Sequence, residues 1–94
     1  MAFIRAFLRT DLSRGDWYAG IRGFLSADAQ EKYTTVDPRN VPSTEIVGGA
    51  AVVDASSVFL ASVEVPTGAG VFAVTLSRSE VGEDWVVERA ELQQ

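Results

Sequence analysis

The sequence predicts a single α+β domain, in which N-terminal helices pack on a curved sheet of four antiparallel strands. Apolar residues recur at the spacing of a helical face over residues 2–36. Over residues 44–92 the pattern changes to β-branched residues and a two-residue alternation, which is typical of strands. Because consecutive strands with short links usually pair with their neighbours, we expect an antiparallel meander. The chain of 94 residues has the length of one domain.

The first helix is predicted over residues 2–12, where apolar side chains occupy one helical face. These side chains are Phe3, Ile4, Phe7 and Leu8. Arg5 and Arg9 lie four residues apart on the opposite side. Gly15 is expected to end this segment, because glycine is common just beyond the C-terminus of a helix.

A second helix is predicted to follow, with Asp16 as its N-cap. Its apolar residues again have helical spacing, and they are Trp17, Ile21, Phe24 and Leu25. Ser26 is expected to cap a short third helix over residues 27–33. The connector Asp37–Pro42 contains two prolines, and the residue before a proline is disfavoured in the α region. We therefore expect no helix beyond it.

Four strands are predicted, at residues 44–54, 57–65, 70–78 and 84–92. Gly48 and Gly49 in the first strand indicate a bulge or a bend. Phe59 and Leu60 place apolar side chains on both faces of the second strand, so we expect this strand to be covered on both sides there.

Charge and hydropathy exclude several kinds of partner. The net charge of −5 disfavours nucleic-acid binding, which depends on basic residues that neutralise phosphates. Four arginines concentrate in the first quarter of the chain, where a solvated helix face is the favoured interpretation and a surface for an anionic partner is the alternative. They are Arg5, Arg9, Arg14 and Arg22. No stretch approaches the roughly 20 apolar residues of a membrane span, so we expect no membrane insertion by this segment.

The chain contains neither cysteine nor histidine. Disulfides and Cys- or His-based zinc sites are therefore impossible, and neither residue can serve as nucleophile or general base. The segment Gly68–Gly70 lies between two strands, so it predicts a hairpin turn and not a phosphate-binding loop. Asp37 and Asp54 are interpreted as turn residues. We accordingly predict no catalytic residue, no cofactor and no metal.

Two groups of residues are candidates for binding. Trp17, Tyr18 and Tyr33 are the candidate pocket residues, because aromatic side chains between helices and a curved sheet can line a cavity, and a buried phenol needs a polar partner. Phe59, Leu60 and Val71 are the candidate interface residues. Glu64 and Arg78 lie on neighbouring predicted strands and form a candidate cross-strand ion pair, depending on the register.

The order of elements resembles the nuclear transport factor 2-like (cystatin-like cone) superfamily, and the resemblance covers nearly the whole chain. More narrowly, the chain resembles small domains of actinobacterial and other Gram-positive envelope proteins. It is also similar to the extracytoplasmic domains of conjugative-transposon channel proteins, whose fold is like that of the periplasmic assembly component of type IV secretion. The segments that show the likeness are the helix Phe3–Leu8, Asp16-Trp17, Phe24-Leu25, Asp37–Pro42 and Asp84–Val87.

This resemblance implies a function based on protein contacts. The superfamily's enzymes, such as ketosteroid isomerases and dehydratases, use Asp, His and Tyr in the cone, and this sequence has no histidine. The conjugation-type members imply an extracytoplasmic location, with an N-terminal membrane anchor preceding the segment seen here. We expect a non-catalytic interaction or assembly module of an envelope or secretion-type complex, which binds a protein partner or forms a homodimer. The alternative is a small cone-fold enzyme or a binder of an apolar ligand, which would use Tyr18, Tyr33 and Asp16.

Overall fold

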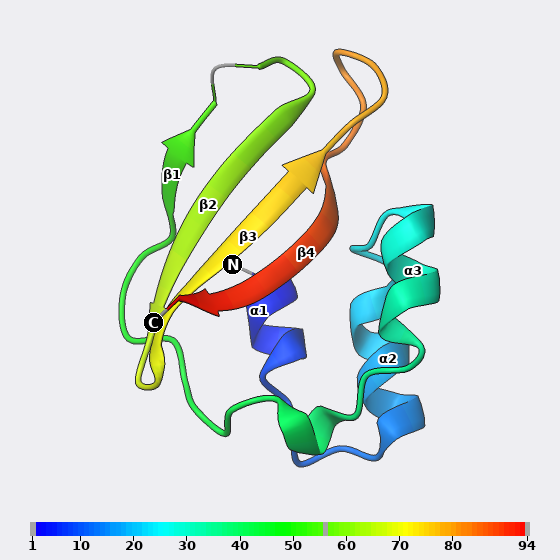
Figure 1. Ribbon diagram of the computed structural model, residues 1–94, viewed down its shortest axis with the longest axis vertical. Coiled ribbons are helices and arrows are strands. Elements are labelled where there is room, and N and C mark those ends of the chain that lie inside the picture. The colour runs from blue at the N-terminus through cyan, green and yellow to red at the C-terminus, as the bar shows by residue number, and fades with distance from the viewer. Residues whose placement is uncertain (1, 56, 94) are drawn as a thin grey trace.

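The computed structural model describes residues 2–55 and 57–93 and confirms the α+β class (Figure 1). Within these residues three α-helices come first, namely α1 (Ala2–Phe7), α2 (Arg14–Arg22) and α3 (Ala27–Tyr33). A single 3₁₀ turn, η1 (Pro38–Asn40), lies in the predicted connector. Four strands follow, namely β1 (Ala51–Asp54), β2 (Leu60–Thr67), β3 (Gly70–Ser77) and β4 (Val86–Gln93).

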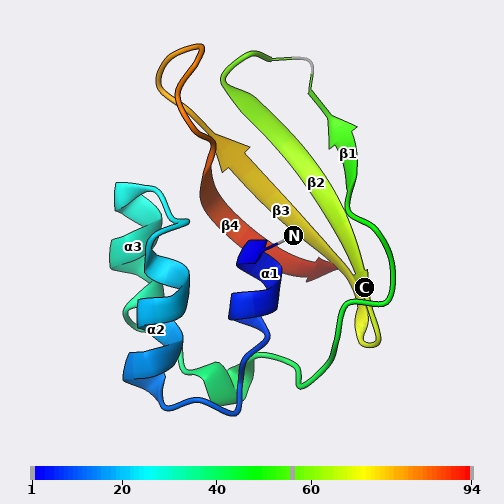
Figure 2. The ribbon, with the colours of Figure 1, turned by 180° about the vertical axis from the view of Figure 1, so that it is seen from behind.

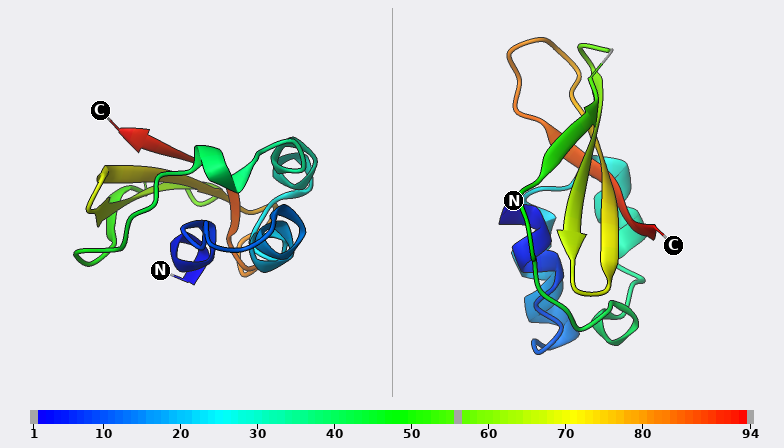
Figure 3. Two further views of the ribbon diagram at one scale, coloured as in Figure 1. Left: turned by 90° about the horizontal axis from the view of Figure 1, so that it is seen from below. Right: turned by 90° about the vertical axis from the view of Figure 1, so that its left-hand side faces the viewer.

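The strands form one antiparallel sheet in the order β1-β2-β3-β4, which is the predicted meander. The sheet is curled but not closed, so β1 and β4 are its two edges. α1 lies against one face of the sheet, whereas α2 and α3 lie on the side of β4 (Figures 2 and 3). Seen from either side, the ends of the strands near the β1–β2 and β3–β4 connections project beyond the helices.

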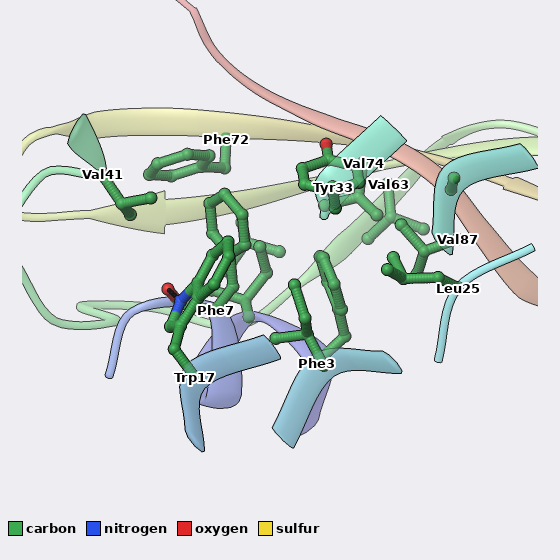
Figure 4. Close-up of a cluster of buried hydrophobic side chains, with 14 residues drawn as sticks. Phe3, Phe7, Trp17, Leu25, Tyr33, Val41, Val63, Phe72, Val74 and Val87 are labelled. Carbon is green, nitrogen blue, oxygen red and sulfur yellow. Dashed lines mark hydrogen bonds between the residues drawn. The ribbon is translucent and has the colours of Figure 1, made fainter. Parts of the chain in front are cut away.

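The core lies between the helices and the inner face of the sheet (Figure 4). Strand alternation sends every second side chain of β2 and β3 inward, so that Val65 and Val74 are fully buried. Aromatic rings from the helices fill the space beneath them, with Phe7 in contact with the rings of Phe3, Trp17 and Phe72.

The helix boundaries differ from those predicted near residue 13. Ser13, and not Asp16, is the N-cap of α2, because its extended backbone lets its side-chain oxygen accept a hydrogen bond from the Asp16 backbone N–H. Asp16 lies in the first turn of α2, where a carboxylate interacts favourably with the helix dipole. Gly15 lies inside α2, and α1 ends at Phe7, where the backbone carbonyl accepts a hydrogen bond from the Trp17 indole at 2.8 Å. The prediction of Ser26 as the N-cap of α3 is confirmed.

The edge formed by β4 is partly covered by the segment that links α2 to α3 and by α3 itself. Val87 donates its backbone N–H to the Phe24 carbonyl at 2.6 Å, and its own carbonyl accepts from the Ser26 N–H at 2.9 Å. Leu25, predicted to lie on the second helix, instead forms a parallel bridge with Val87. The β1 edge has a different character, because all four residues of this strand are exposed.

The first strand is shorter than predicted. Residues 44–50 precede β1, and in this segment only Ile46 forms an isolated bridge, with Thr67. A Cβ atom at Gly48 would lie 2.9 Å from Cγ of Pro66, so a glycine is needed for this close approach of the chain to β2. The backbone does bend at Gly48, as predicted, whereas the register irregularity of β1 lies between Val52 and Asp54.

Candidate interaction surface

The uncovered end of the sheet exposes a group of large apolar side chains. We call this group the distal surface, and its members are Val53, Val58, Phe59, Leu60, Val81 and Trp85. They come from β1, the start of β2 and the two connections that project beyond the helices. Leu60 is 55% exposed and Val81 is 67% exposed, so neither side chain belongs to the core.

The expectation that the second strand is covered on both sides near Phe59 and Leu60 was wrong. Phe59 precedes β2 and is 45% exposed, and Leu60 is the first residue of the strand. The reason is the extent of the helices, which pack against the other end of the sheet and stop short of this one. Strand alternation indicates which face a side chain is on, but not whether another element covers that face.

Arg78 connects the two loops of the distal surface. Its guanidinium lies over the Trp85 ring, 4.4 Å from the centroid, and its Nε donates a hydrogen bond to the Val58 carbonyl at 2.7 Å. Its backbone N–H donates to the Phe59 carbonyl at 3.1 Å. A cation–π contact of this kind at an exposed site contributes about 0.5–1 kcal/mol. The Arg78 side chain thus links the two distal loops.

This position of Arg78 corrects the candidate ion pair with Glu64. In the β2–β3 register Glu64 lies opposite Ala73, whereas Ser77, the residue before Arg78, lies opposite Leu60. Glu64 therefore lies in the middle of β2, whereas Arg78 follows the distal end of β3. The register depends on the turn at Gly68–Gly70, which strand propensity does not reveal.

The three candidate interface residues are not brought together either. Val71 pairs with Pro66 next to the β2–β3 turn, while Leu60 pairs with Ser77 at the distal end. Val71 is also only partly exposed. Phe59 and Leu60 lie on the distal surface, and Val71 does not.

A shallow hollow of about 230 Å³ adjoins Leu60 on the outer face of the sheet. Polar and apolar groups contribute about equally to its lining, and the polar residues include Asp54, Ser62, Thr75 and Arg89. The distal end therefore combines apolar side chains with a hollow of mixed polarity, the mixture that is found where protein partners bind.

The three candidate pocket residues occupy separate positions. Trp17 is fully buried in the core, and Tyr18 donates its hydroxyl to the Gln30 carbonyl at 2.8 Å, which ties α2 to α3. Tyr33 is buried at the β4 edge, where its hydroxyl oxygen accepts a hydrogen bond from the Ala90 N–H at 3.0 Å. Burial raises the pKa of the Tyr33 phenol above its ordinary value, although the Ala90 N–H acts in the opposite direction.

Tyr33 lines a second hollow, of about 320 Å³, between η1 and the inner face of β3 and β4. Most of its lining is apolar, and Lys32 and Asn40 are the polar side chains. Neither Trp17 nor Tyr18 belongs to this lining. Asp16, the carboxylate considered for a ligand site, is exposed on α2 and does not line this hollow.

Charged groups elsewhere form local pairs. Asp37 caps η1 and accepts hydrogen bonds from the Arg39 guanidinium and backbone N–H, and these bonds lower the pKa of the Asp37 carboxyl to about 2. Arg9 pairs with Asp11 at 3.1 Å.

In the part of the chain that the structure describes, carboxylates form no cluster able to hold a metal ion. No helix among the same residues has both the length and the hydrophobicity that a membrane crossing needs.

The sequence patterns did not indicate four members of the distal surface as contact residues, namely Val53, Val58, Val81 and Trp85. They named Arg78 only as a candidate ion-pair partner of Glu64. A signal was present for Val58, because Val58, Phe59 and Leu60 are three consecutive apolar residues beside a turn, and a short strand with one buried face would bury only one or two of them. No comparable signal exists for Arg78, whose role depends on the approach of two loops that are distant in sequence.

Compared with protein-family models, with curated proteins and with solved structures, the chain gave no match in any of the three comparisons. What the geometry defines is a small α+β domain with a filled core and one uncovered, apolar end of its sheet.

Proposed function

We propose that this domain is a non-catalytic protein-interaction module and that the distal surface is its contact site. The observation that supports the proposal is the exposure of Phe59, Leu60 and Trp85 at the distal end of the sheet, where Arg78 links the two loops. Exposed apolar side chains that gather in one region, and do not occur singly, often mark a contact with another macromolecule. Tryptophan and arginine are, in addition, the residues most enriched among the hot spots of protein interfaces.

The wider setting of this function is also a proposal. The resemblance to the nuclear transport factor 2-like superfamily, and to conjugation and envelope proteins within it, rests on the order of helices, connector and meander. An assembly role in a cell-envelope or secretion-type complex is compatible with a contact surface and a core without catalytic side chains. The proposed function includes two kinds of occupant for the distal surface, a partner protein and a second copy of the chain.

Site-specific photo-crosslinking in the cells that make the protein tests the contact site. The photoreactive amino acid benzoylphenylalanine replaces Phe59 in one variant and the exposed Ala19 on α2 in the control. We expect a covalent adduct from position 59 that is lost when Leu60→Ser and Trp85→Ser are added, and no adduct from position 19. Equal adducts from both positions, or none from position 59, would refute the proposal.

The hollow beside Tyr33 supports a second candidate function, the binding of a small apolar ligand with an anionic group. Its volume of about 320 Å³ is near the lower end of the range for ligand pockets, and Lys32 lies at its rim. Thermal unfolding in the presence of octanoate tests this function, with Val36→Trp as the variant that fills the hollow and Lys32→Gln as the variant that removes the cation. A ligand-dependent rise in Tm that both variants diminish is expected, and no rise in the unmodified protein would exclude it.

A further inference from the structure

The charges of the chain are divided unevenly between its helices and its sheet. Residues 1–40 contain six basic and five acidic side chains, whereas residues 41–94 contain two basic and eight acidic ones. The helical part thus has a net charge of +1 and the part with the sheet −6, so the sheet accounts for the acidity of the whole chain.

Several of these acids lie beside the distal surface. Glu80, Glu83 and Asp84 are exposed in the β3–β4 connection, next to Val81 and Trp85. The nearest basic side chain in this connection, Arg78, is engaged with the Trp85 ring and the Val58 carbonyl. The apolar side chains of the distal surface therefore lie beside a strongly acidic loop.

This arrangement discriminates between the two kinds of occupant. In a two-fold symmetric dimer through the distal surface, the same patch of both copies meets itself. The acidic loops of the two copies would then approach each other, and like charges brought together across an interface oppose association. A partner that brings basic side chains to the acidic loop gains attraction at the same place.

The helical part of a second copy is less suited than such a partner to supply basic side chains to the acidic loop. Two of its six basic side chains are already paired, Arg9 with Asp11 at 3.1 Å and Arg39 with Asp37 at 2.8 Å. Contacts between the helical part of one copy and the distal surface of the next would also be head-to-tail, an arrangement that leads to rings or open filaments.

We infer that the distal surface binds a segment of another protein that combines apolar and basic side chains. This inference rests on the proposed interaction function and names the chemistry of the partner. The apolar side chains of the segment contact Phe59, Leu60 and Trp85, and its lysines or arginines face Glu80, Glu83 and Asp84. Such charges speed up encounter and select the partner, while the apolar contacts supply most of the affinity.

Binding of a matched set of synthetic peptides, followed by fluorescence anisotropy, tests the inference. The peptides have the same length and the same leucine and tryptophan content, and their remaining positions hold lysine, glutamine or glutamate. We expect the lysine peptide to bind most tightly and the glutamate peptide least tightly. Raising NaCl from about 0.1 M to about 1 M shortens the Debye length from about 10 Å to about 3 Å, and it should reduce the difference between the peptides.

Two variants of the full chain separate the contributions of the acids. The triple variant Glu80→Gln, Glu83→Gln and Asp84→Asn should bind the lysine peptide about eightfold more weakly, if each exposed pair contributes a factor of about two. The matched control also removes three negative charges, but at positions that lie away from the distal surface. Its substitutions are Glu31→Gln, Glu64→Gln and Glu91→Gln. The control should bind the lysine peptide within about twofold of the unmodified chain, because distant exposed charges are largely screened.

The outcomes distinguish failure of this inference from failure of the interaction function. Equal binding of all three peptides, abolished by Phe59→Ser with Leu60→Thr, would overturn the basic partner but keep the contact site. Concentration-dependent dimers that the same double variant disrupts, without peptide binding, would replace the partner by a second copy. A strictly monomeric chain that binds no peptide, together with an absence of crosslinks from position 59, would overturn both.

Discussion

The two ends of the central strands differ in what their apolar residues do. At one end Val65 of β2 and Val74 of β3 are completely buried beneath the helices. At the other end of the same strands, Leu60 and Phe59 are about half exposed, and the loops around them are held by Arg78. The comparison shows that the reach of the helices, and not strand hydrophobicity, decides which apolar side chains form the core. The exposed distal residues therefore contribute little to the stability of the fold, and their side chains are accessible to a partner.

Removal of Trp17 should have the largest effect on the covered end. The ring is fully buried and its indole N–H donates to the Phe7 carbonyl, so Trp17→Ala leaves both a cavity and an unpaired carbonyl. A loss of about 3–5 kcal/mol in the free energy of unfolding is expected, which is most of the stability of a small domain. Trp85→Ala is the matched control and should cost less than about 1 kcal/mol in urea denaturation. Similar losses in the free energy of unfolding for both variants would contradict the proposed difference between the two ends.

A pair of substitutions within β2 tests the same distinction on a single strand. Val65→Ala should cost about 2 kcal/mol, because a fully buried valine loses its packing against the helices. Leu60→Ala removes a larger side chain but should cost only about 0.5 kcal/mol, because Leu60 is exposed. The two free energies of unfolding are compared by urea denaturation at one temperature. A larger loss for Leu60→Ala would show that the distal end has a covering element in solution.

Tyr33→Phe tests the closure of the β4 edge by α3. The Ala90 N–H loses its acceptor, so a loss of about 1 kcal/mol is expected at neutral pH. Because burial raises the pKa of the folded Tyr33 phenol above 10.0, its contribution is fully present below this pH and is lost as the pH rises through the folded pKa. The unmodified chain should therefore lose more stability above about pH 10 than Tyr33→Phe does. Parallel pH profiles of the two proteins would contradict this assignment.

Arg78→Ala should loosen the distal loops without unfolding the core. The loss of the contact with Trp85 should cost about 0.5–1 kcal/mol. Acrylamide should then quench tryptophan fluorescence more strongly, since Trp85 becomes more accessible while Trp17 stays buried. Arg22→Ala, which removes the same charge from α2, is the control and should leave quenching unchanged. Unchanged quenching in Arg78→Ala would mean that the loops are held by other contacts.

The smallest effect is expected from Asp37→Asn in the connector. Asparagine can still cap η1, so the substitution removes mainly the charge that pairs with Arg39. The pKa of folded Asp37 is lowered to about 2, so its contribution is present above 3.8 and is lost as the pH falls through about 2. The difference in Tm between the two proteins should be small at neutral pH and should vanish below about pH 2. A difference that persists in acid would assign the effect to the cap itself.

Several features of the fold were predictable from local patterns. The helices-then-meander order, the cap at Ser26 and the connector between Pro38 and Pro42 follow from spacing, cap chemistry and proline geometry, which are properties of neighbouring residues. The N-cap of α2 was misassigned because Ser13 and Asp16 are both good capping residues and lie three positions apart. The absence of cysteine and histidine also limits the available chemistry, whatever the fold.

The candidate site depended on distances between segments far apart in sequence. The sequence by itself indicated Phe59 and Leu60 as contact residues, but it placed Val71 with them and paired Arg78 with Glu64. Only the tertiary structure separates Val71 from Leu60, through the register of β2 and β3, and brings Arg78 to Val58 and Trp85. The physical reason is that alternation determines the face of a strand on which a side chain lies. Whether that face is covered depends on where the helices end and how far the loops extend.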